Sequence, residues 1–246
     1  MTTSSRDVRV WTILAAAVVA VLGATRPARG ADDLPPAVQS AGVGRPVAGH
    51  RLQVAVGGRA SFVRSAGYDP FSMDDVLSQF STTVLWALPR REGSAFSTAV
   101  GVMGEVGGSG ATARGADADL SVMRGGLVLE ERFAPVRWGY AFGRVSPALM
   151  AVEATLRDPS SPATLETSYS SFAFDASLGL AANLNPGGRG VGFWLVADCG
   201  YGWAPSHALT LAPALAAADA DKAGTTSLGT LAPRGAFLRA GLALSF

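Results

Sequence analysis

The sequence predicts an all-β protein: an eight-stranded antiparallel up-and-down transmembrane β-barrel, with ten strands as the alternative. Charged residues make up only 16% of the chain, and 30 glycines are spread along it without a collagen-like period. Runs of about ten residues alternate large apolar with small or polar side chains, which is the length of a tilted membrane strand. Short and long connections alternate between these runs, as they do when turns gather at one end of a barrel and loops at the other.

Residues 1–30 are typical of a signal peptide. Arg6 and Arg9 precede an apolar run over residues 11–23. A run of about a dozen apolar residues suits the core of a secretory signal and is short for a membrane-spanning helix. Small residues before Ala31 predict cleavage at that point, with an earlier site as the alternative.

Residues 31–48 are rich in Pro, Gly and Ala without periodicity, so we expect a flexible periplasmic leader there. The barrel should then occupy residues 49–246. No later apolar stretch is long enough for a membrane helix, and an exported chain without one spans a membrane only as strands.

The first three predicted strands are regular and lie at about 50–62, 78–88 and 95–106. Each sets large apolar residues, such as Val54, Trp86 and Val102, on one face. The other face carries small or polar residues.

The fourth and fifth predicted strands are less regular. The fourth, about 119–131, changes the phase of its alternation near Met123. The fifth begins at Val136 and sets its aromatic residues on one face, which would then turn Arg144 toward lipid. We therefore expect a β-bulge near Gly143. We also expect the strand to weaken or leave the membrane at Pro147.

The last three predicted strands lie at about 169–184, 190–203 and 235–246. The sixth strand has the cleanest alternation, with Phe172, Phe174, Leu178, Leu180 and Leu184 on its apolar face. The final strand ends the sequence on an aromatic residue of its apolar face.

Connections of two lengths separate these strands. The short ones, at 89–94, 132–135 and 185–189, predict periplasmic turns, and the long ones, at 63–77, 107–118, 154–168 and 204–234, predict external loops. The last loop either extends the two strands beside it or adds two further strands to make a ten-stranded barrel.

A soluble barrel is the structural alternative, and it would expose a charged face rich in Lys and Glu to water. After residue 31 the chain has a single lysine, Lys222, and the non-aromatic face is mostly Gly, Ala and Ser. Such small residues suit the narrow interior of an eight-stranded barrel, which favours the membrane form.

Charges on the inward face need partners, because an unpaired buried charge is costly. We expect one network of four cations and four anions, which are Arg51, Arg59, Arg137, Arg239, Glu105, Glu130, Asp175 and Asp198. Asp198 is the expected neighbour of Arg239, and strand closure should bring Arg59 to the other side. We interpret the network as filling and stiffening the lumen; a conduction gate is the alternative.

The last eight residues carry the most specific signal. Arg239, Gly241, Leu244 and Phe246 form a polar-x-Gly-x-x-apolar-x-Phe pattern, which resembles the C-terminal assembly signal of bacterial outer-membrane barrels. With the strand pattern, the region resembles the eight-stranded OmpA/OmpX-like family. The resemblance implies the cell outer membrane, folding by the outer-membrane barrel assembly machinery, and roles in membrane integrity, adhesion or surface interaction.

The sequence contains few residues that could form a catalytic or metal-binding site. After residue 31 the histidines are His50 and His207, too few for a metal site of the usual kind. Outer-membrane lipid A deacylases use a His-x-Ser motif, but here Ala208 and Leu209 follow His207. We expect no catalytic residue, no cofactor and no metal. The lone Cys199 cannot form an internal disulfide and is interpreted as a small apolar side chain.

Residues 1–30 contain four arginines and one aspartate, so the remainder of a chain of charge +1 is slightly acidic. We therefore expect no nucleic-acid partner. The expected partners are outer-membrane lipid, the assembly machinery and an unidentified ligand of the extracellular loops, with the chain a monomer. The predicted function is structural or surface interaction; the alternatives are a narrow pore and, third, a lipid-modifying enzyme.

Overall fold

The computed structural model describes residues 51–89, 94–113, 115–136, 138–157, 164–186, 190–213 and 224–246. The predicted signal peptide, the predicted leader and Arg137 lie outside these ranges. Within them, no helix is both long and apolar enough to cross a membrane.

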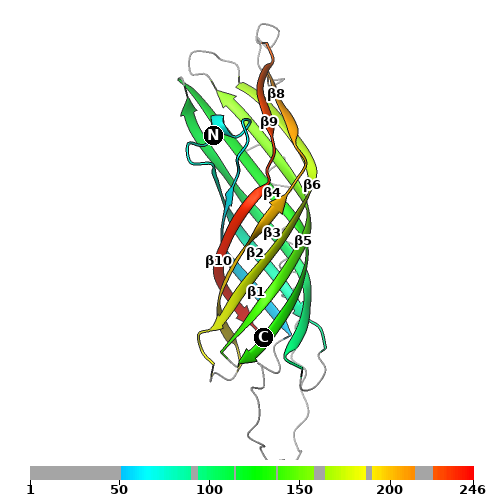
Figure 1. Ribbon diagram of the computed structural model, residues 1–246. Coiled ribbons are helices and arrows are strands. Elements are labelled where there is room, and N and C mark those ends of the chain that lie inside the picture. The colour runs from blue at the N-terminus through cyan, green and yellow to red at the C-terminus, as the bar shows by residue number, and fades with distance from the viewer. Residues whose placement is uncertain are drawn as a thin grey trace, which may run out of the picture. The chain divides into compact units, whose positions relative to one another are not determined.

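Eight strands form a closed antiparallel barrel, which confirms the predicted fold class (Figure 1). Its wall strands, in order around the barrel, are β1 (Leu52–Phe62), β2 (Val76–Ala87), β3 (Phe96–Ala113), β4 (Ala116–Val136), β5 (Gly139–Arg157), β6 (Thr164–Asn183), β7 (Gly192–Trp203) and β10 (Gly235–Ser245). Pairing of β1 with β10 closes the wall. We call the end with the β2–β3, β4–β5 and β6–β7 connections the turn end, and the opposite end the mouth.

The two remaining strands, β8 (His207–Pro213) and β9 (Thr226–Leu231), form a hairpin beyond the mouth (Figure 1). β6 pairs with β7 up to Phe174 and Trp203, then with β8 at Leu165 and Pro213, one residue out of register. The hairpin therefore prolongs β7 and β10 instead of entering the wall. The ten-stranded alternative is wrong because β1 and β10 already close the sheet.

Four adjacent strands are longer than predicted. β3 to β6 contain 18, 21, 19 and 20 residues, whereas β1 contains 11 and β7 contains 12. The predicted loops 107–118 and 154–168 are therefore largely strand, and the predicted turn 132–135 belongs to β4. Glycine and alanine in 107–113 suggest a loop by composition. In the structure their small size lets neighbouring backbones approach, since a Cβ on Gly107 would overlap the carbonyl of Ser78.

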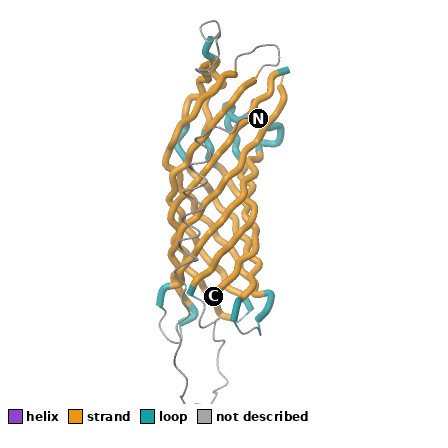
Figure 2. Tube along the Cα trace, turned by 180° about the vertical axis from the view of Figure 1, so that it is seen from behind, coloured by secondary structure: helices purple, strands orange, loops and turns teal. Residues whose placement is uncertain are grey.

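The wall strands are tilted relative to the long axis of the barrel (Figure 2). Large apolar side chains encircle its outside. They alternate with inward residues on every wall strand and include Val56, Phe80, Trp86, Val102, Leu129, Leu149, Phe174, Leu178, Leu180, Leu195, Tyr201, Leu238, Leu242 and Phe246. We call this surface the belt. Leu178 is 71% exposed, and the predicted outward faces of the sixth and eighth strands are confirmed. An exposed apolar band with aromatic residues is the surface that a membrane barrel turns to lipid.

The structure corrects the predicted faces of β4. Its even-numbered residues point inward from Ala118 to Arg132, so Leu120 and Val122 share the inner face with Arg124 and Glu130. There is no change of phase near Met123. Apolar residues were expected to point outward everywhere, and above the belt that expectation is wrong.

The structure also corrects β5. Tyr140 and Phe142 point inward together with Arg144, and β5 pairs with β6 in one unbroken register, so no bulge occurs at Gly143. The inward aromatics have partners, since the Arg144 guanidinium lies 4.9 Å from the centre of the Phe142 ring. Pro147 does not end the strand, which continues to Arg157.

Above the belt the polarity of the wall is inverted. The mouth is filled by an apolar cluster, the mouth core, contributed by the first connection, the wall strands and the β8–β9 hairpin; it includes Tyr68, Phe71, Leu77, Leu120, Val122, Met150, Val152, Leu209, Leu211 and Leu231. Tyr68 precedes the short 3₁₀ helix η1 (Asp69–Phe71) and Phe71 ends it; both have exposed fractions of 0%. Outside the same stretch the residues are polar, with Asp119, Glu153 and Glu166 exposed.

Candidate functional site

The lumen holds two connected groups of ion pairs below the mouth core. In the first, the Arg59 guanidinium donates to Glu105 at 2.9 Å and to Asp175 at 2.5 Å. Arg124 donates to the same two carboxylates at 3.1 and 2.9 Å. Arg239 donates to Glu105 at 2.8 Å. Residues from β1, β3, β4, β6 and β10 thus meet at one level of the barrel.

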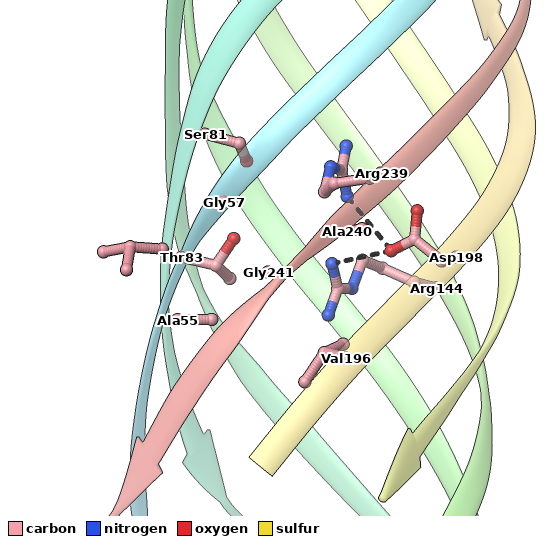
Figure 3. A pocket seen from close by; sticks show the side chains of 11 residues that line it. Ala55, Gly57, Ser81, Thr83, Arg144, Val196, Asp198, Arg239, Ala240 and Gly241 are labelled. Atoms are coloured by element: carbon pink, nitrogen blue, oxygen red, sulfur yellow. Dashed lines mark hydrogen bonds and ion pairs between the residues drawn. The ribbon is translucent and has the colours of Figure 1, made fainter. Parts of the chain in front are cut away.

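The second group lies nearer the turn end. Glu130 accepts from Arg132 at 2.6 Å and from Arg144 at 2.5 Å. Arg132 also donates to the amide oxygen of Gln53 at 2.5 Å. Asp198 links the two groups, because it accepts from Arg144 at 3.2 Å and from Arg239 at 3.4 Å (Figure 3).

Six of the eight predicted lumen residues lie in this network; they are Arg59, Glu105, Glu130, Asp175, Asp198 and Arg239. Arg51 is an exception, since it is exposed just before β1, and so its predicted lumen position is wrong. Arg137 lies outside the described residues.

Sequence reasoning missed three lumen cations. Arg124 follows the inward parity of β4, which an uninterrupted alternation would have shown. Arg144 was left out of the predicted network, and only a bulge near Gly143, which does not exist, was expected to turn it away from lipid. Arg132 was placed in a turn, although β4 continues past it. The errors at Arg124 and Arg144 come from requiring aromatic and aliphatic residues to face outward, and the error at Arg132 comes from predicting a turn at 132–135.

The network is almost fully removed from solvent. Its side chains are between 0% and 13% exposed, and Glu105 and Glu130 are at the lower limit. Ion pairs interact strongly in such an environment, but each lone charge would carry a large desolvation cost. Removing one partner of such a pair costs about 3–5 kcal/mol. The network therefore couples the wall strands across the lumen.

A small cavity lies beside Asp198, Arg144 and Arg239, and Figure 3 shows their side chains next to it. Gly57 and Gly241 line it on the β1–β10 side. Its volume of ≈ 20 Å³ is enough for about one water molecule. Oδ1 of Asp198 and Nε of Arg239 are buried without a hydrogen-bond partner, so a water here would satisfy polar atoms.

The four residues of the predicted assembly signal are placed by β10 and the C-terminus. Arg239 points into the lumen, while Leu244 and Phe246 are exposed on the belt. Gly241 faces Gly57 across the closing strands, where a Cβ would overlap the Val56 carbonyl. The backbone N–H of Phe246 donates to the carbonyl of Leu52 at 2.8 Å, which joins the end of the chain to the start of the wall.

Other candidate chemical groups are dispersed. His207 begins β8 and stacks on the Tyr169 ring with 4.3 Å between centroids. Cys199 is exposed on the outer face of β7. Among the described residues, no three His, Cys, Asp or Glu side chains are placed to hold a metal ion.

The mouth end carries a second candidate site, formed by backbone. β3 and β4 pair as far as Ala113 and Ala116, whereas β2 pairs with β3 only up to Gly108. We call the parts of β3–β6 that rise past the belt the extension. On its β3 side, no described strand pairs with residues 109–113, so this edge is open. An open strand edge presents unpaired N–H and C=O groups.

Comparisons with known proteins give a likeness in structure. No protein-family model matches the chain, and no curated protein sequence matches it. The crystal structure of Ail, the attachment invasion locus protein of Yersinia pestis, is 12% identical with a TM-score of 0.42, covering 80% of this chain and 97% of that one. A structure of Ail with the heparin analogue sucrose octasulfate gives a TM-score of 0.44 at the same identity and coverage. The strand pairing itself identifies this chain as a closed eight-stranded antiparallel barrel.

Proposed function

We propose that this protein is an outer-membrane β-barrel that presents its β3–β6 extension to a binding partner at the cell surface. The open edge of β3 at 109–113 is the observation that carries the proposal. The sequence led us to expect partner binding by the extracellular loops. We now propose that the partner binds to the strands of the extension instead.

The belt supports the membrane part of the proposal. Leu149, Leu178 and Leu180 have large exposed apolar side chains in the middle of the wall, where water would be unfavourable. The predicted signal peptide supports export, and among exported chains a closed barrel suits the outer membrane. Outer-membrane lipid and the barrel assembly machinery are then its first partners, with the barrel inserted as a monomer.

The extension supports the interaction part. Its outer face is polar, and its inner face packs on the mouth core, so it stands as a stable sheet above the lipid. A partner segment in extended conformation can add to an open edge through main-chain hydrogen bonds. Such pairing needs neither a pocket nor a catalytic group.

Location is tested by fractionating Gram-negative cells that express the full chain. The protein should occur in the outer-membrane fraction and migrate differently on a gel before and after heating. Recovery of the folded barrel from the soluble fraction would contradict the proposal.

Interaction is tested with two lysine substitutions on the outer face of the extension. Thr112→Lys places a long charged side chain at the open edge, which discourages strand addition. Thr155→Lys, on the central strand β5, is the matched control. Cells displaying the parent or the control should adhere to cultured host cells or to one another, and cells displaying Thr112→Lys should adhere several-fold less. Equal adhesion of all three, or none above cells lacking the chain, would overturn the proposal.

A narrow pore is the rival function, and the polar lumen is the observation in its favour. Against it, the mouth core and the ion pairs occupy the described lumen at successive levels, and the cavity beside Asp198 has room for about one water molecule. We therefore expect no single-channel conductance above background in planar bilayers.

We also propose that the protein is not an enzyme: mass spectrometry should find lipid A unchanged by its expression.

A further inference from the structure

The contact between β1 and β10 joins the first and last strands of the wall. The six contacts from β1 round to β7 join strands that follow one another in the chain, and β7 and β10 flank the β8–β9 hairpin. Bringing the two ends of the wall together therefore carries the largest loop-closure entropy. We call this contact the seam.

The apolar residues of the seam do not determine its register. On the belt face, Val54 lies opposite Leu244 and Val56 opposite Leu242. Sliding β10 by two residues would keep each residue on its face and would again pair aliphatic with aliphatic side chains. On the lumen face Gly57 lies opposite Gly241 beside the small cavity (Figure 3), and the two backbones approach so closely that a Cβ on Gly241 would overlap the Val56 carbonyl.

Among the charged residues, a pair of like charges depends on register. Arg59 and Arg239 are direct partners across the seam, an arrangement that is destabilising by itself. Their guanidinium groups share the buried Phe237 ring, at 4.0 and 5.2 Å from its centre.

Carboxylates from other strands neutralise this pair. Glu105 on β3 accepts from both arginines, Asp175 on β6 accepts from Arg59, and Asp198 lies directly opposite Arg239 on β7. A two-residue slip would move Arg239 by about 6–7 Å along the seam, beyond hydrogen-bond reach of the carboxylates it now meets.

We infer that Glu105, Asp175 and Asp198 form a carboxylate group, which we call the latch, that can pair with both seam arginines in only one register of β10 against β1. This pairing positions the closing strand. The carboxylates are held by strands that pair locally, and the seam arginines complete the network when β10 meets β1. Register at closure is then set in the lumen, by charge, and the lipid-facing residues supply only the apolar surface.

The test reads the register directly, in the full chain refolded into lipid vesicles with Cys199→Ser as background. Ala60→Cys with Leu238→Cys reports the native register, because these residues are partners. Ala60→Cys with Ala240→Cys reports a two-residue slip, since these Cα atoms lie too far apart for a disulfide unless the strand moves. Cross-linked fractions are measured on gels under mild oxidation.

Asp175→Asn removes a latch carboxylate and should raise the slipped cross-link by about tenfold or more. Glu130→Gln is the matched control: it also removes a buried, paired carboxylate, but one that pairs with Arg132 and Arg144 and with neither seam arginine. This control should lose stability and keep the native cross-link alone.

Adding Arg59→Gln to Asp175→Asn removes the like-charge partner and should restore the native cross-link. That rescue separates a latch from general destabilisation, and it is decisive even where Asp175→Asn alone yields no barrel. The inference is overturned by a double variant that fails as Asp175→Asn does, by equal slippage in Glu130→Gln, or by native cross-linking alone in Asp175→Asn.

Discussion

The belt level and the mouth of this barrel follow opposite rules, although the same strands build both. At the belt, β6 turns Leu178 outward and Asp175 inward; nearer the mouth it turns Ser168 outward and packs Leu165 against the mouth core. The wall does not change its pleat between these levels, since β5 and β6 keep one register throughout. What changes is the medium outside. Apolar side chains face outward beside lipid, and inward beside water.

Ion pairs provide the largest expected contrast between the two levels. Glu130→Gln leaves Arg132 and Arg144 with an uncompensated buried charge and should lower the free energy of unfolding by about 3–5 kcal/mol. Asp117 is exposed on the extension, and Asp117→Asn should cost less than about 1 kcal/mol. Urea unfolding of the barrel in lipid vesicles measures both. Similar losses for the two variants would mean that the lumen is far wetter than its burial indicates.

Packing of the mouth gives the next effect. Phe71→Ala opens a cavity in the mouth core and should destabilise by about 3 kcal/mol, the lower end of the usual range, because the first connection can relax around it. Met73, two residues along, is 93% exposed, and Met73→Ala should stay within about 0.5 kcal/mol of the parent. The same unfolding experiment applies. A neutral Phe71→Ala would show that the mouth core contributes no stability.

The smallest expected effect comes from two positions on the outer face of one strand, one at the belt and one in the extension. Leu178 and Ser168 both point outward from β6, at the belt and in the extension. Leu178→Arg should cost about 2 kcal/mol, because the charge enters the lipid zone, whereas Ser168→Arg should be neutral within about 0.5 kcal/mol. Equal costs would place both positions in the same medium and remove the boundary between the two levels.

The side-chain orientations were predictable in strands whose apolar side chains face outward along the whole length considered. β10 and the lower part of β6 alternate without interruption, so the outward positions of Leu242 and Leu180 follow from period two alone. The pairing of Asp198 on β7 with Arg239 on β10 followed from strand order, and the structure pairs them directly. Local pattern was sufficient wherever lipid alone set the outward face.

The strands that cross the boundary were not predictable in the same way. Leu120 and Val122 look like a phase change only when apolar is taken to mean outward, and that reading concealed Arg124. Tyr140 and Phe142 were assigned to lipid because sequence does not show that guanidinium groups lie over their rings. Where a strand passes from lipid to water, its own side-chain pattern does not show the change. The residues that its inward side chains contact inside the barrel must be known as well.

The mouth core also bears on how the chain crosses a bilayer. Tyr68 and Phe71 come from the first connection, and Leu209, Leu211 and Leu231 from the last hairpin. One segment follows the first wall strand and the other precedes the last wall strand. Their side chains can therefore pack together only after both segments have reached the mouth. Burying each such side chain is favourable by about 1.5–3 kcal/mol. In an inserted barrel this burial favours the state in which both segments stay at the mouth, because moving either one away would expose these side chains.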